Sequence, residues 1–154
     1  MKYTKTISAG VLAASIAFIG SWEGMRTKAY IPIPGDVPTV CFGETRGVKL
    51  GDTYTVAQCK DMFGKRLTEF ATQINKCLDA PSRIPDGAYV AFLSLAYNIG
   101  EQGFCRSSVA RLANQGDLRA ACNRLPAFNK AGGKVVQGLV NRRAAERKLC
   151  LGSL

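Results

Sequence analysis

The chain of 154 residues contains no histidine. This absence excludes the Ser-His and Cys-His catalytic arrangements, and it excludes any metal site that uses an imidazole ligand. There is also no Cys-x-x-Cys pair and no low-complexity segment. Chemistry must therefore run on carboxylates, hydroxyls, thiols or amines, and we expect neither a metal ion nor another cofactor.

Acidic residues are also scarce, with 11 Asp and Glu against 21 Lys and Arg and a formal net charge of +10. The positive electrostatic field of such a chain favours an anionic partner: nucleic acid, phospholipid or an acidic wall polymer. The basic residues are spread along the chain, so we expect general attraction to a polyanion and no nucleic-acid groove. The apolar fraction of 47% is enough for one core, in a single domain or in two lobes.

A long hydrophobic run is missing too. The apolar stretch from Ile7 to Trp22 has about sixteen residues, short of the roughly 20 that comfortably span a bilayer. Lys2 and Lys5 precede it, and a cationic flank before an apolar run is the pattern of an export signal.

Three outcomes are open for this segment: cleavage as a signal peptide, permanent anchoring, or a marginal span that later leaves the membrane intact. Its richness in Gly, Ala and Ser argues against a durable anchor. Cleavage near Gly20 would leave Glu23 almost at a frayed terminus, which is a poor place for a residue that needs fixed geometry. We therefore favour a retained, releasable segment.

Cysteine, in contrast, is plentiful, with six residues in the chain. An even count behind an export-like N-terminus favours disulfide bonds in an oxidising compartment. Six cysteines allow fifteen pairings, and the sequence alone does not choose among them. We expect the pairs that close local loops, which are Cys41 with Cys59, Cys77 with Cys105, and Cys122 with Cys150.

Turn-forming residues dominate positions 29–54, where prolines and glycines surround the β-prone run Thr39 to Phe42. We expect a small β lobe there, rich in hairpins. Thr55-Val-Ala-Gln58 has the form of a capping box, and apolar residues at helical spacing follow it. This pattern predicts a long helix over 56–78.

Residues 80–154 predict a helical lobe. The strongly apolar stretch 85–100 indicates a buried central helix, because it is too short for a membrane span. Ser107 or Ser108 caps a further helix, Asp117 caps another, and a basic helix closes the chain. The expected fold class is α+β and mainly helical, with two lobes joined by the long helix and a ligand cleft between them.

Four motifs occur in order along the chain: Glu23-Gly-Met-Arg-Thr-Lys-Ala-Tyr30, Thr39-Val-Cys-Phe-Gly-Glu-Thr45, Asn98-Ile-Gly-Glu-Gln-Gly-Phe104 and Gly138-Leu-Val-Asn-Arg-Arg143. In this respect the sequence resembles the phage-type lysozymes (endolysins) of glycoside hydrolase family 24, from about residue 20 to 151. The resemblance implies a lysozyme-like fold. It also implies a muramidase that hydrolyses the β-1,4 bond between N-acetylmuramic acid and N-acetylglucosamine in bacterial peptidoglycan, for lysis of the host cell.

The weakly apolar N-terminus is similar to that of the signal-arrest-release subclass of these endolysins. This implies a signal-anchor segment at residues 1–22 and a lysozyme domain at 23–154. It further implies export by the host secretion machinery and tethering to the inner membrane. The enzyme would then be released into the host periplasm when the proton-motive force collapses. We expect the released protein to be a monomer.

The resemblance assigns Glu23 as the general acid that protonates the leaving glycosidic oxygen, and Thr39 as the residue that holds the attacking water. A carboxyl group in a partly apolar site, beside Trp22, suits the first role. The family usually places a second carboxylate nine positions after the glutamate, where this chain has Pro32. Asp36 lies in the same stretch, and we predict that it takes this role.

Other assignments for these side chains stay open. Gly-Asp is good turn chemistry, so Asp36 could be a turn residue only, and Glu44 and Asp52 are weaker candidates for the second carboxylate. Arg142 would pair with Glu23 or contact the substrate.

By resemblance alone, three polar residues are further substrate-binding candidates: Asn98, Ser107 and Ser108. Capping explains Ser107 or Ser108 equally well.

Two alternative functions also stay open. A lytic transglycosylase on the same scaffold would need only the acid. A non-catalytic cationic protein that binds walls or membranes is made conceivable by Pro32 and by the charge of +10.

Overall fold

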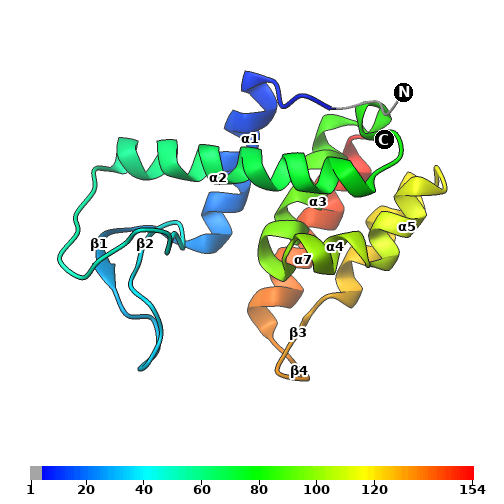
Figure 1. Ribbon diagram of the computed structural model, residues 1–154. Helices are drawn as coiled ribbons and strands as arrows, with labels where there is room; N and C mark the ends of the chain where they lie inside the picture. The colour runs from blue at the N-terminus through cyan, green and yellow to red at the C-terminus, as the bar shows by residue number, and fades with distance from the viewer. Residues whose placement is uncertain (1–4) are drawn as a thin grey trace.

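A computed structural model describes residues 5–154, which form a small β lobe and a larger helical lobe (Figure 1). The expected class, α+β and mainly helical, is confirmed. Helix α2 (Val56–Cys77) runs from one lobe to the other. Its capping box forms as predicted, because Thr55 Oγ1 accepts from the Gln58 amide at 3.1 Å and Gln58 Oε1 accepts from the Thr55 amide at 2.8 Å.

The β lobe is built on one antiparallel pair, β1 (Arg26–Tyr30) and β2 (Thr39–Cys41). Arg26 lies opposite Cys41 and Tyr30 lies opposite Thr39, so the longer strand carries an irregularity between these two pairs. Strand β1 starts at residue 26, three residues before the expected β segment. From within β2, the chain makes a tight turn in which Val40 and Glu44 exchange both backbone hydrogen bonds at 2.9 Å.

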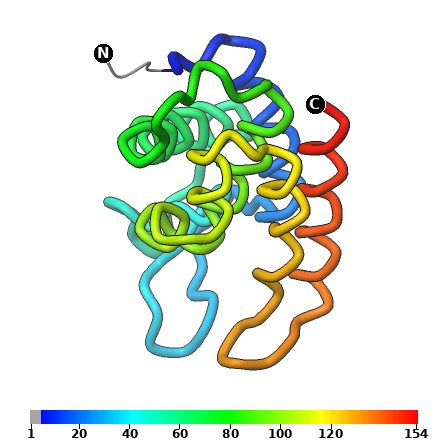
Figure 2. Tube along the Cα trace, turned by 90° about the vertical axis from the view of Figure 1, so that its right-hand side faces the viewer, coloured from blue at the N-terminus to red at the C-terminus, as the bar shows by residue number. Residues whose placement is uncertain are grey.

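The helical lobe surrounds α3 (Asp86–Ile99), in which Ala88 to Ala96 are all buried, as expected for a central helix. The remaining elements of this lobe are η1 (Pro81–Arg83), α4 (Glu101–Cys105), α5 (Ser108–Asn114), α6 (Leu118–Arg124), η2 (Leu125–Ala127), β3 (Lys130–Ala131), β4 (Lys134–Val135) and α7 (Gln137–Gly152). Figure 2 shows the β1–β2 and β3–β4 hairpins extending to the same end of the molecule.

Helix α1 (Ala9–Glu23) is built from the weakly apolar N-terminal segment and packs against α2 and α3. A narrow stripe of Val11, Ser15 and Ile19 is buried, at the i, i+4 spacing of one helix face. Among residues 5–154, no helix combines the length and apolarity needed to cross a membrane. Lys2, part of the predicted export signal, lies outside the described residues.

Three disulfide bonds follow the expected pairing: Cys41–Cys59, Cys77–Cys105 and Cys122–Cys150. The first ties the β lobe to the start of α2, the second ties the end of α2 to α4, and the third ties α6 to α7. Each bond therefore joins elements that the hydrophobic core also brings together.

Candidate active site

Glu23 is the last residue of α1, and Gly24, with φ of 67°, turns the chain away into the β lobe. The carboxylate is held by Arg142 of α7, whose Nη1 donates to Glu23 Oε1 at 2.6 Å. The Arg142 side chain is 5% exposed, while that of Glu23 is 21% exposed. The Glu23 carboxylate is thus held by Arg142 on one side and is accessible to solvent on the other.

Arg142 is fixed in turn by Ser94 on the buried central helix. Its Nε and Nη2 donate to Ser94 Oγ at 3.4 and 3.3 Å, and Nη2 also donates to the Ser94 carbonyl at 3.2 Å. The Ser94 hydroxyl donates to Glu146 Oε1 at 2.6 Å. Glu146 is fully buried and pairs with Arg143, whose Nη2 donates to the same Oε1 at 2.7 Å.

Burial raises the pKa of Glu146, although Arg143 and the hydrogen bond from Ser94 act against this change. Burial also lowers the pKa of Arg143, and the carboxylate of Glu146 opposes that change. Neither group has bulk water to stabilise its charge, so each depends on its partners in this cluster.

Glu23 opens onto a cleft of about 660 Å³ between the lobes. The cleft is lined by Glu23, Gly43, Glu44, Thr45, Arg46, Arg66, Phe70 and Tyr97. Tyr97 joins the two lobes here, because its hydroxyl donates to the carbonyl of Phe42 at 2.8 Å. Burial raises the pKa of Tyr97, and the nearby carboxylates of Glu23 and Glu44 raise it further.

Glu44 is the second carboxylate in the cleft lining, and its oxygens are heavily engaged. Oε1 accepts from Arg66 Nη2 at 2.6 Å and from the amides of Thr45 and Arg46, and Oε2 accepts from Arg66 Nε at 3.2 Å. Burial alone would raise the pKa of Glu44, but these hydrogen bonds and the charge of Arg66 lower it overall. The group is therefore a fixed negative charge.

Asp36 lies outside the cleft lining, on the exposed connection between β1 and β2. Its amide donates to the carbonyl of Ile33, and its Oδ1 accepts from the amide of Val37, both at 2.9 Å. Thr39 is buried and donates to the carbonyl of Val37 at 3.1 Å. The roles assigned to Asp36 and Thr39 stay predictions.

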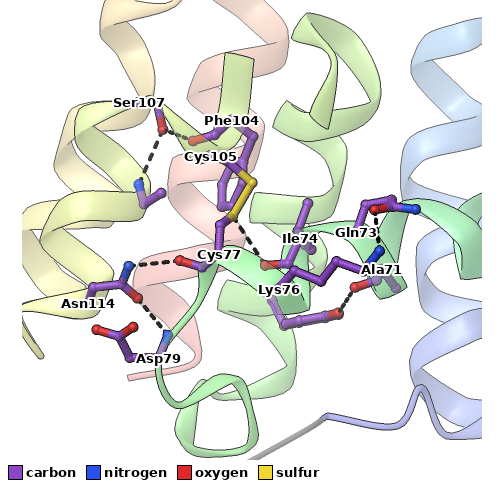
Figure 3. The surroundings of a disulfide bond; sticks show 12 residues. Ala71, Gln73, Ile74, Lys76, Cys77, Asp79, Phe104, Cys105, Ser107 and Asn114 are labelled. Carbon is purple, nitrogen blue, oxygen red and sulfur yellow. Dashed lines mark hydrogen bonds between the residues drawn. A yellow bond between two sulfur atoms is a disulfide. The ribbon is translucent and has the colours of Figure 1, made fainter. Parts of the chain in front are cut away.

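The predicted substrate-binding residues are engaged inside the helical lobe. Asn98 Oδ1 accepts from Arg143 Nη1 at 2.8 Å, and Ser108 Oγ accepts from Arg124 Nε at 2.8 Å. Ser107 is the cap of α5, where its oxygen accepts from the Ala110 amide and its hydroxyl donates to the carbonyl of Phe104. Figure 3 shows Ser107 beside the Cys77–Cys105 disulfide. Substrate contact by these side chains stays a prediction.

Sequence reasoning did not single out Ser94 or Tyr97. Both lie in an apolar stretch whose pattern predicts a buried helix. The sequence associates them with the site only because Ser94 lies four residues, and Tyr97 one residue, before the candidate Asn98. Arg66, which is 22 residues from Glu44, had no local signal at all. Within residues 5–154, no group of three or more His, Cys, Asp or Glu side chains could hold a metal ion.

Comparison with known proteins gives consistent matches over most of the chain. Residues 20–146 match the family model described as phage lysozyme. The SAR-endolysin of Bacteriophage PS119 is 40% identical over 152 residues, which covers 94% of this chain and 89% of that protein.

Two solved forms of one related protein differ in their similarity to this structure. The active form of the P1 phage endolysin Lyz superposes with a TM-score of 0.80 at 31% identity, over 90% of this chain and 83% of that one. The secreted inactive form gives a TM-score of 0.59 at 26% identity, over 90% and 94%.

Proposed function

The chain belongs to the phage lysozyme family, and from that premise we propose that Glu23 is the general acid of its muramidase reaction. As a member of this family the protein is a glycoside hydrolase, an endolysin that lyses the host by cleaving peptidoglycan. The observation that supports the proposal is the ion pair of Glu23 with the buried Arg142 at the edge of the cleft between the lobes.

In the proposed reaction, protonated Glu23 gives its proton to the glycosidic oxygen as the bond from that oxygen to C1 of the muramic acid breaks. A water molecule then adds its hydroxyl to C1 and gives its other proton to a carboxylate. Arg142 stabilises the negative charge that remains on Glu23 after the transfer.

We keep Asp36 as the proposed second carboxylate. One of its oxygens accepts a hydrogen bond from Val37, while both oxygens of Glu44 accept bonds from Arg66. A base must accept a proton from water, and the hydrogen bonds on Glu44 disfavour its protonated form. A substrate bound along the β lobe could contact Asp36 from outside the cleft lining.

The test is turbidity loss on purified peptidoglycan. The wild-type protein should clear the suspension, and Glu23→Gln, which keeps the shape of the side chain, should slow clearing by about 10³-fold because the proton donor is lost. Glu101→Gln on α4 is a matched control that removes the same charge elsewhere. Clearing by Glu23→Gln at the wild-type rate would contradict the role of Glu23 as the acid, and failure of the wild-type protein to clear the suspension would favour a non-catalytic cationic protein.

We further propose that residues 7–22 first tether the enzyme to the inner membrane after export by the host secretion machinery. Ile19 is fully buried against the protein in this structure, so the segment cannot be in the bilayer and in this fold at once. The higher TM-score with the active form of the P1 endolysin than with its secreted inactive form supports assignment of this structure to the released state. Release would then assemble α1 and place Glu23 beside Arg142.

Fractionation of expressing cells tests the release. The intact protein should pellet with energised membranes and become soluble after addition of an uncoupler, with no change in mass. A mass loss of about two kilodaltons would instead indicate signal-peptide cleavage. The released protein is expected to sediment as a monomer.

A further inference from the structure

The buried group behind Glu23 contains two guanidinium groups, those of Arg142 and Arg143, and one carboxylate, that of Glu146. Arg142 lies between the carboxylates, with Nη1 2.6 Å from Glu23 Oε1 and Nε 3.4 Å from Glu146 Oε1. Ser94 lies at the junction, since its hydroxyl donates to Glu146 while its oxygen accepts from Arg142. A single arginine is therefore shared between a carboxylate that faces the cleft and one that is fully buried.

We propose that Glu146 and Ser94 are positioning residues of the lysozyme reaction, which set how much of the Arg142 charge acts on Glu23. The proposal rests on the proposed role of Glu23 as the acid. Neither residue would touch the substrate, because Glu146 and Ser94 are both fully buried. They act through the orientation and the charge balance of the Arg142 guanidinium.

The sharing matters because a general acid must keep its proton until the substrate arrives. An unshared guanidinium at 2.6 Å would apply its full charge to the ionised form of the Glu23 carboxylate. Glu146 opposes this effect, because its carboxylate also interacts with the Arg142 guanidinium, through Nε. Only part of the Arg142 charge then acts on Glu23, and that part stabilises the negative charge left after proton transfer.

Other charged and titratable groups also face this cluster. On the cleft side, α3 contributes Tyr97, the turn after β2 contributes Glu44, and α2 contributes Arg66. On the buried side, α7 contributes Arg143, which is bound to Glu146 and to Asn98. Arg66 is paired with Glu44 and Arg143 with Glu146, so Arg142 is the cation that both Glu23 and Glu146 contact directly.

The sign of the expected change follows from the charges. Glu146→Gln removes the negative charge behind Arg142 and leaves the charges of Arg142 and Arg143 without that buried counterion. Ionisation of Glu23 then occurs at a lower pH, and the basic limb of the pH–activity profile should move down by about one pH unit for a charge removed at this range. Activity near the new limb falls through kcat, while KM changes little because substrate contacts are untouched.

Ser94→Ala is the second variant, since loss of the buried Glu146 charge could prevent folding. It removes a neutral hydroxyl that competes for Arg142, so the basic limb should move in the same direction but by less. Ser15→Ala is the matched control, because Ser15 is also a fully buried helix serine, with its hydroxyl donating to the Val11 carbonyl. Glu101→Gln is the control for a lost charge.

The direct measurement is a ¹³C carboxyl titration of the folded proteins, with the Glu23 signal identified by its absence in Glu23→Gln. The Glu23 transition should shift to lower pH in Glu146→Gln and, by less, in Ser94→Ala, together with the basic limb of the pH–activity profile. Both controls should superpose on the wild type.

An unshifted transition in a folded Glu146→Gln or Ser94→Ala would overturn the proposal. If the wild type instead fails to cleave peptidoglycan while the transitions shift, the proposed function is wrong and the coupling stands.

Discussion

At the scale of single residues, the site depends on how three carboxylates are held. Glu23 has one charged partner and an open face, Glu44 is engaged at both oxygens, and Asp36 has one bond to the adjacent amide of Val37. A carboxyl group that gives or takes a proton needs at least one oxygen lone pair that no hydrogen-bond donor of the protein occupies. These environments separate the acid, a fixed charge and the proposed base.

Substitution of the two candidate bases tests this division. Asp36→Asn should lower kcat on peptidoglycan by roughly 10²-fold or more, because the attacking water loses its proton acceptor. Glu44→Gln should lower kcat by less than about tenfold and should mainly lower the melting temperature, because a half-buried ion pair with Arg66 is broken. The reverse result, an active Asp36→Asn and an inactive Glu44→Gln, would move the role to Glu44.

At the scale of elements, α1 carries the acid and is itself held by a narrow stripe of side chains. Ile19 is the large apolar residue of that stripe that is fully buried, and it lies four residues before Glu23. On the opposing helix, Gly64 faces α1, since a Cβ there would lie in ordinary contact with Ile16 Cδ1, at 3.4 Å. The position of Glu23 is therefore a consequence of how α1 packs on α2.

Ile19→Ala should lower the free energy of unfolding by roughly 2–4 kcal/mol, because it removes a buried side chain and leaves a cavity. The measurement is chemical denaturation of the purified protein, with the exposed Ala14→Ser on the same helix as control. A change within about 0.5 kcal/mol would show that α1 does not depend on this contact.

Element positions followed from the sequence where a local signal was strong. The capping box at Thr55 and the apolar run after Pro85 placed α2 and α3 closely. The short α4 was missed because Gly103 lies inside it and weakens the helical pattern. The β3–β4 hairpin was missed although Gly132 and Gly133, with φ of 56° and 77°, form the two-residue turn that such hairpins favour.

The site was predictable only where residues carry their own chemistry. The resemblance named Glu23 and Arg142, and the structure pairs them across 119 residues. The sequence pattern around Ser94 predicts only a small residue in an apolar helix. Its proposed role depends on the packing of α7 against α3, which no local pattern predicts. Long-range contacts of this kind depend on the packing of whole helices.

At the scale of the whole molecule, three disulfides join elements across the fold, and the net charge of +10 favours an anionic partner. The Cys122–Cys150 bond connects α6 to α7, the helix that carries Arg142 and Glu146. This disulfide therefore restrains α7, the helix whose Arg142 holds Glu23.

Removal of that bond by the double substitution Cys122→Ala and Cys150→Ala should cost roughly 3–4 kcal/mol of stability, as expected for a loop of this length. Thermal unfolding under oxidising conditions measures the loss. An unchanged melting temperature would show that core packing alone holds α7 in place.

Mass spectrometry of the muropeptides released from purified peptidoglycan tests most directly the central claim that Glu23 is the acid of a hydrolytic muramidase. The wild-type protein should release fragments that end in reducing N-acetylmuramic acid, and Glu23→Gln should release almost none. Fragments ending in 1,6-anhydro-muramic acid would contradict hydrolysis, and reducing fragments released by Glu23→Gln at the wild-type rate would contradict the role of Glu23.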